Sequence, residues 1–184
     1  IWASDMPTPE EIGLLAGERA VARSGAVKPP TGSFPILYDE RISSGLIGHL
    51  LAAVNGSAIV RGSSWLRDAM DMQVLPEGIT LHENPHLPRM SASRMFDAEG
   101  LATAPRDIVA DGILRGWFLD LSTGRKLGLD STASAVRGLG SSPSPGVSNI
   151  VMTEGAHSRA DLIAQMGRGL VVTSLLGSSI NPTT

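Results

Sequence analysis

The 184-residue sequence contains no cysteine, so it can form neither disulfides nor a thiolate metal site from its own residues. An excess of basic residues is also missing. With 15 Lys and Arg against 18 Asp and Glu, the formal net charge is -3, which gives no electrostatic footprint for nucleic acid. Aromatic residues make up only 4%, too few for a base-stacking platform. No apolar run reaches the ~18 residues that a membrane span needs. We therefore expect neither nucleic acid nor a membrane as a partner.

The composition that remains is typical of a globular protein, with 42% hydrophobic and 18% charged residues. Segments with helical spacing alternate with short strand-like segments and turns, and they show no regular strand-helix-strand repeat. The sequence therefore predicts an α+β fold, in which an antiparallel β-sheet packs against a few helices.

Start and stop signals place the individual elements. The predicted helices are 8–24, 39–54 and 158–166, with N-caps at Thr8, Asp39 and Ser158. Asn55-Gly56 is expected to end the second helix. The predicted strands are 34–38, the region of 79–82, a hairpin over 107–120 that turns at Asp111-Gly112, and a buried strand over 169–173. The Gly/Ser/Pro-rich stretch 138–148 is expected to be a mobile loop.

The two ends of the sequence bear on its domain organisation. Ile1 is not a start methionine, and no basic or apolar leader follows it. We expect a fragment of a larger two-domain protein. In that interpretation residues 1–32 are a helix and linker that join a missing N-terminal domain, and residues 33–184 are a C-terminal domain that is truncated at its C-terminus.

One segment matches a zinc-peptidase motif by its letters. His82-Glu83-Asn84-Pro85-His86 fits the pattern His-Glu-x-x-His, which binds Zn²⁺ only when a helix places both imidazoles on one face. Pro85 costs about 3 kcal/mol in a helix interior and pushes Asn84 toward extended geometry. The residues before it alternate like a strand. We therefore interpret His82 and His86 as two histidines of a non-helical segment and not as ligands.

A set of short motifs, in one order along the chain, resembles the TldD/PmbA family, which has been described as modulators of DNA gyrase and as peptidases. The resemblance covers nearly the whole chain. Its most specific stretches are Gly48-His49-Leu50-Leu51, Pro85-His86-Leu87-Pro88, Phe96-Asp97-x-Glu99-Gly100, Arg125-Lys126-Leu127-Gly128 and Met166-Gly167-Arg168-Gly169. The resemblance implies a heterodimer of a TldD-type and a PmbA-type subunit.

The resemblance also implies where a catalytic motif would stand. The TldD-type helix carries His-Glu-x-x-x-His-Gly, and on this sequence the three groups fall at Ser44, Gly45 and His49. Catalytic zinc needs about three protein ligands and a carboxylate that takes a proton from the bound water. A serine hydroxyl is a poor ligand, and glycine has no side chain. We expect no catalytic residue and no metal bound by this chain, with zinc in the TldD-type partner.

Several polar residues have a simpler structural interpretation. His49, on the flank of a helix, is more typical of a hydrogen-bonded structural histidine than of a ligand. Asp97 and Glu99 invite a general acid/base role, but they stand at a turn before Gly100, where acidic residues commonly form the turn itself. Phe96, Asp97, Glu99 and Arg168 are retained as candidate contacts for a substrate or a partner.

These observations give one leading hypothesis and two alternatives. The leading one is a cytoplasmic, non-catalytic subunit of a TldD/PmbA-type metallopeptidase, which shapes the site for extended peptides or unfolded proteins while a TldD-type partner hydrolyses them. The first alternative is an active zinc metallopeptidase with a non-standard ligand set, such as His49 with His82 or His86. The second is a homodimeric peptide-binding protein. The charge pattern supports no direct contact with DNA gyrase.

Overall fold

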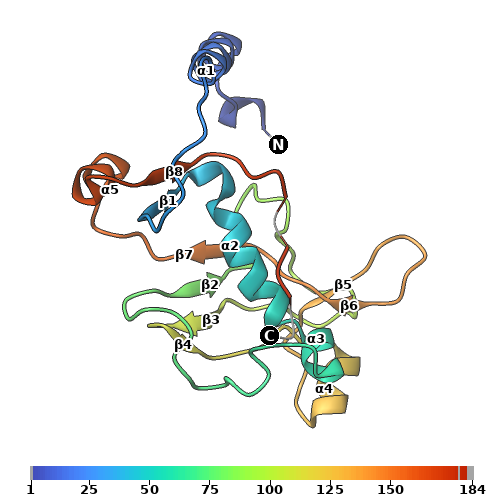
Figure 1. The fold of residues 1–184 in the computed structure, drawn as a ribbon. Coiled ribbons are helices and arrows are strands. Elements are labelled where there is room, and N and C mark those ends of the chain that lie inside the picture. Colours follow the sequence, from blue (N-terminus) through green and yellow to red (C-terminus); the bar gives the residue numbers. More distant parts are fainter. Residues whose placement is uncertain (1, 178, 182–184) are drawn as a thin grey trace.

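The computed structural model describes residues 2–177 and 179–181, and it has the predicted α+β architecture (Figure 1). The helices are η1 (Ala3–Asp5), α1 (Pro9–Val21), α2 (Glu40–Ala53), α3 (Gly56–Arg61), α4 (Leu121–Leu127) and α5 (Arg159–Met166). The strands are β1 (Ile36–Tyr38), β2 (Leu81–Glu83), β3 (Arg106–Ala110), β4 (Ile113–Leu114), β5 (Ala135–Val136), β6 (Ser144–Pro145), β7 (Ile150–Met152) and β8 (Leu170–Val172).

The largest sheet has the antiparallel order β4-β3-β2-β7. The predicted hairpin is confirmed at β3 and β4, where Asp111 and Gly112 both have positive φ, as a tight two-residue turn requires. The hairpin is shorter than expected, because β4 ends at Leu114. Phe118 does not continue the strand but donates its N–H to Val54 O at the end of α2, and its side chain is fully buried.

Helix α2 lies over this sheet and supplies much of the core (Figure 1). Its predicted N-cap is confirmed, since the Asp39 side chain accepts a hydrogen bond from Arg41 N. The core cluster comprises Leu50, Ala53 and Val54 with Leu66, Leu81, Ile108, Val109, Leu114 and Phe118. The predicted end of the second helix at Asn55-Gly56 is confirmed, because α2 ends at Ala53 with Val54 as its C-cap. The sequence did not predict that Asn55 also caps a further helix, α3, by accepting a hydrogen bond from Ser57 N.

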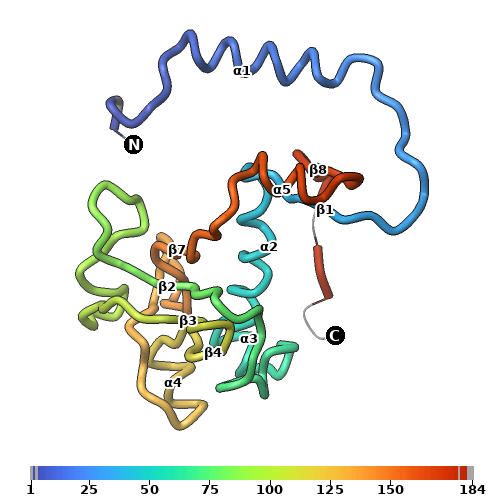
Figure 2. Tube along the Cα trace, turned by 90° about the vertical axis from the view of Figure 1, so that its left-hand side faces the viewer, coloured from blue at the N-terminus to red at the C-terminus, as the bar shows by residue number. Residues whose placement is uncertain are grey.

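A second region lies beyond the N-terminal end of α2 and contains α1, α5 and the pair β1–β8 (Figure 2). The N-caps predicted at Thr8 and Ser158 are confirmed at α1 and α5, and each is part of a capping box. The strand predicted over 169–173 exists as β8, but the expectation that it is buried is wrong, because all three residues are only partly buried. β8 also pairs with β1 in parallel, so the antiparallel prediction holds for the main sheet and not for this pair.

The stretch 138–148, predicted to be a loop, is partly strand. Its residues Ser144 and Pro145 form β6, which pairs with β5 and closes a hairpin over the loop 137–143. Within the described residues, no helix combines the length and the apolar character needed to cross a bilayer.

Candidate functional site

The three positions of the implied catalytic motif lie within α2. Ser44 and Gly45 are exposed, and His49 is partly buried one residue before the core residue Leu50. A Cβ placed at Gly45 would meet no atom within 4 Å, so packing gives no reason for glycine at this position. The helix thus has space for a carboxylate where the family motif has one, but this sequence does not supply it.

A shallow groove runs beside these positions, between α2 and β7. Its volume is about 440 Å³ and its lining is mostly apolar. The lining residues are Ser43, Ser44, Leu46, Ile47 and Leu51 from α2 with Ile150 and Met152 from β7. β7 is the last strand in the order β4-β3-β2-β7, so one of its edges pairs with β2 and the other pairs with no strand in the described part of the chain. The groove therefore borders an open strand edge.

The segment with the zinc-peptidase letters, residues 82–86, is not a helix: His82 and Glu83 end strand β2, and Pro85 and His86 lie in the turn that follows, which confirms the prediction that the segment is not helical. His82 points away from the core, and its Nδ1 lies 2.7 Å from Asp107 Oδ1 on β3. His86 Nε2 lies 3.1 Å from Thr103 Oγ1. Strand alternation sends Glu83 to the opposite face from His82, where it is buried. The two imidazoles therefore have separate partners.

No group of three His, Cys, Asp or Glu side chains that could hold a metal ion occurs among residues 2–177 and 179–181. On α2 itself, a hydroxyl, a glycine and one imidazole do not fit a catalytic zinc site, which needs about three ligands and a nearby base. The alternative ligand set of His49 with His82 or His86 gains no support from this geometry.

A polar cluster beside the hydrophobic core, on the same face of β2 as Leu81, was not anticipated from the sequence. Glu83 Oε2 accepts a hydrogen bond from Arg106 Nε at 2.8 Å, and Glu83 Oε1 accepts two from Ser148, from its backbone N and its Oγ. Arg106 also donates to Trp117 O and to Ser134 Oγ, and its guanidinium lies 5.0 Å from the centroid of the Phe118 ring. Burial lowers the pKa of Arg106, and the adjacent Glu83 carboxylate opposes that shift.

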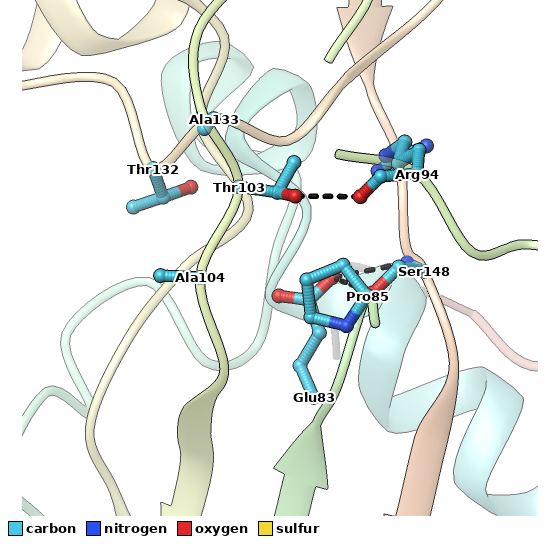
Figure 3. A pocket seen from close by; sticks show the side chains of 8 residues that line it. All are labelled: Glu83, Pro85, Arg94, Thr103, Ala104, Thr132, Ala133 and Ser148. Carbon is cyan, nitrogen blue, oxygen red and sulfur yellow. Dashed lines mark hydrogen bonds between the residues drawn. The ribbon is translucent and has the colours of Figure 1, made fainter. Parts of the chain in front are cut away.

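Figure 3 shows the small polar pocket beside this cluster, with Glu83 hydrogen-bonded to Ser148 and Thr103 hydrogen-bonded to the carbonyl oxygen of Arg94. Both carboxylate oxygens of Glu83 accept hydrogen bonds from protein donors. This arrangement indicates that the carboxylate stabilises the fold and does not transfer protons. The alternation of buried and exposed residues around His82 predicts which face Glu83 takes. Its partners Arg106 and Ser148 lie 23 and 65 residues further along the chain, and no local pattern identifies them.

The turn interpretation accounts for both carboxylates of the Phe96–Gly100 motif. Asp97 is buried, and its Oδ1 accepts hydrogen bonds from Glu99 N and Leu101 N while its Oδ2 accepts one from Ala135 N. Glu99 Oε2 accepts a hydrogen bond from Leu121 N at the start of α4. Phe96, in contrast, is 66% exposed. Arg168 is also exposed, with its guanidinium 5.6 Å from the centroid of the Phe34 ring. Phe96 and Arg168 therefore remain the accessible members of the predicted contact set.

Comparison with known proteins agrees with the resemblance seen in the motifs. Residues 31–184 match the family model of the PmbA/TldA metallopeptidase C-terminal domain. The chain belongs to the PmbA/TldD family. Among curated relatives, the Metalloprotease PmbA of Escherichia coli O157:H7 is 37% identical over 181 residues, which is 98% of this chain and 38% of the relative. The chain thus spans less than two fifths of that PmbA/TldD protein's length.

Two solved structures of PmbA/TldD proteins share the fold. One, from Bacteroides thetaiotaomicron and described as a modulator of DNA gyrase, has a TM-score of 0.82 and 32% identity over 93% of this chain and 37% of that protein. The other, TldE from Thermococcus kodakarensis, has a TM-score of 0.75 and 26% identity over 90% of this chain and 39% of that protein. The likeness places the α2 groove and the main sheet in the C-terminal domain of PmbA/TldD metallopeptidases.

Proposed function

We propose that this chain is part of the non-catalytic subunit of a heteromeric PmbA/TldD-type metallopeptidase in the cytoplasm. The observation that carries the proposal is the composition of the outer side of α2. At the positions where the family's TldD-type helix has a ligand and a base, this helix has Ser44 and Gly45, both exposed and neither able to serve.

In this proposal the metal chemistry belongs to a TldD-type partner subunit. Zinc bound there supplies a water of lowered pKa and polarises the peptide carbonyl. This chain contributes shape and binding surface. Its homologues carry metalloprotease names, which supports a peptidase role for the assembly as a whole.

The groove between α2 and β7 supports an extended peptide as the ligand of this subunit. A peptide strand that pairs with the open edge of β7 would be held by main-chain hydrogen bonds, which tolerate many sequences. Its alternate side chains would lie against the apolar lining formed by Leu46, Ile47 and Met152. Such binding suits short peptides and unfolded segments.

The proposal is tested by purifying the full-length protein alone and together with its TldD-type partner, then measuring zinc by elemental analysis and hydrolysis of a mixed peptide substrate. We expect the isolated protein to hold no stoichiometric zinc and to show no turnover, and the pair to show both. Zinc and turnover in the isolated protein would instead favour the active metallopeptidase. A protein that binds peptides, forms only homodimers and never associates with a TldD-type chain would favour the peptide-binding alternative.

A further inference from the structure

The pair Asn55-Gly56 has a reactivity of its own in addition to its place at the start of α3. Asn55 is the only one of the four asparagines in the sequence that precedes a glycine, since Asn84 and Asn181 precede proline and Asn149 precedes isoleucine. Asparagine is a thermolabile residue, and it deamidates most readily before glycine, because no side chain then hinders attack by the following backbone nitrogen. The sequence therefore contains one position that is chemically prone to modification.

The reaction needs water but no enzyme and no cofactor. The backbone nitrogen of Gly56 attacks Cγ of Asn55 and forms a bond to it, which closes a cyclic succinimide. The bond between Cγ and Nδ2 of Asn55 breaks, and the amide group leaves as ammonia with the proton that Gly56 N has lost. Water then opens the ring at either of its carbonyls. The products are aspartate and isoaspartate, and in isoaspartate the backbone runs through the former side chain.

In the folded chain, hydrogen bonds engage the nitrogen that attacks and the side-chain amide that it attacks. Gly56 is buried, and its N–H donates to Phe118 O at 2.8 Å, so solvent has no direct access to the proton that must leave. Asn55 Oδ1 accepts a hydrogen bond from Ser57 N at 2.9 Å, and Asn55 Nδ2 donates one to Pro145 O at 2.8 Å. Ring closure requires that these contacts break.

The contacts belong to three parts of the fold that open only together. Asn55 and Gly56 begin α3, Phe118 follows the β3–β4 hairpin, and Pro145 is in β6. A Cβ at Gly56 would lie 2.6 Å from Phe118 O, so the two backbones approach as closely as glycine permits. The Phe118 side chain is itself fully buried in the core. Exposure of the Gly56 N–H therefore requires local unfolding that separates α3 from the core.

We infer that Asn55 is a modification site that the fold keeps unreactive and that deamidates when this junction opens. The step is one-way. Aspartate at position 55 still has an oxygen to cap α3, but it has no N–H for Pro145 O and places a carboxylate against that carbonyl. Isoaspartate lengthens the backbone beside Gly56, where the approach of Phe118 O leaves no room. This inference does not depend on the proposed function.

The experiment measures deamidation at Asn55 by peptide mass spectrometry, after incubation of the full-length protein in warm, mildly alkaline buffer with and without denaturing urea. In urea, Asn55 should deamidate faster than Asn84 or Asn149. Without urea, its rate should fall about tenfold or more, because a reaction that requires opening follows the population of the open state. Asn149 is the internal control and should react slowly under both conditions, since the side chain of Ile150 hinders the attack.

Phe118→Leu provides a second measurement on the same site. It removes part of the buried ring next to Gly56 and should raise the population of the open state. Deamidation of Asn55 should then be several-fold faster in buffer and unchanged in urea.

Three results would overturn the inference. Equal rates at Asn55 with and without urea would show that the fold gives no protection. A rate in urea no higher than that of Asn149 would show that Asn55 is not the reactive position. An Asn55→Asp variant that unfolds at the same urea concentration as the parent would show that the modified chain restores the junction. We expect its midpoint to be lower.

Discussion

Two polar regions of this molecule contrast in how they are built. In the polar cluster beside the hydrophobic core, Glu83 is buried and Arg106 is partly buried, with 21% of its side chain exposed. The two are paired at 2.8 Å and bonded to Ser148, Ser134 and the carbonyl of Trp117. On the outer side of α2, Ser44 and Gly45 face solvent, and a Cβ at Gly45 would touch nothing within 4 Å. The first region contains charged groups that are committed to structure. The second is accessible to solvent and has no ionisable side chain at positions 44 and 45.

The contrast shows that ionisable residues alone are a poor guide to chemistry in this fold. A buried carboxylate whose two oxygens both accept hydrogen bonds from protein donors, as Glu83 does, contributes to the structure of the fold. An accessible helix face without ligands can shape a site but cannot perform hydrolysis.

Removing the arginine of the buried pair should destabilise the protein strongly. Arg106→Ala leaves the Glu83 carboxylate buried without its counter-ion, which costs roughly 3–5 kcal/mol in comparable buried pairs. The free energy of unfolding from urea titration measures the loss. The control is Arg115→Ala, because Arg115 pairs with Asp71 at the surface, where both side chains are largely exposed and a pair is worth about 0–1 kcal/mol. Equal effects of the two changes would contradict the structural role of the cluster.

Substitution by alanine should change the free energy of unfolding in opposite directions at two glycines, Gly56 and Gly45. A Cβ at Gly56 would lie 2.6 Å from Phe118 O and 2.8 Å from Leu119 Cδ2, so Gly56→Ala should cost about 1–3 kcal/mol through overpacking. Gly45→Ala meets no neighbour and lies inside a helix, where alanine is favoured by about 0.5–1 kcal/mol. Urea unfolding of both variants decides the point, and a destabilising Gly45→Ala would mean that this face is packed.

The stability that the N-cap Asp39 gives to α2 should fall at acidic pH. The Arg41 guanidinium, which donates to Asp39, lowers the pKa of this N-cap carboxyl to about 2. An unfolded Asp has a pKa of about 3.9, so the ionised form stabilises the fold above about pH 4, and this contribution disappears as the pH falls from about 4 to about 2. The urea midpoint of the parent should therefore decline over this range. Asp39→Asn, which can still cap the helix, should remove that part of the pH dependence.

The sequence predicts the local features of the fold well, because caps and turns are encoded by adjacent residues. The boxes at Thr8 and Ser158, the cap at Asp39 and the turn at Asp111-Gly112 are all present. What fails depends on tertiary context. Asn55-Gly56 follows the end of α2 as predicted, but the sequence did not predict that a further helix, α3, begins at Gly56, whose N–H donates to Phe118 O. Leu170–Val172 has the composition of a buried strand, yet it pairs with β1 in a region where the described chain leaves it half covered.

At the candidate site, too, the sequence predicts the local features and does not predict those that depend on tertiary context. The sequence identifies the segment 82–86 as a non-helical mimic of a zinc motif, since Pro85 is a local signal, and it marks Asp97 and Glu99 as turn residues. The groove could not be predicted in this way. Its two walls, α2 and β7, are about a hundred residues apart in sequence, and only the sheet order β4-β3-β2-β7 brings Ile150 and Met152 beside Leu46.

His49 is the one imidazole left at the motif positions, so His49→Ala in the assembled peptidase probes whether this helix takes part in catalysis. We expect the zinc content and the rate of peptide hydrolysis of the variant complex to equal those of the parent, measured on the same preparations. Loss of one zinc per complex together with loss of turnover would contradict the account.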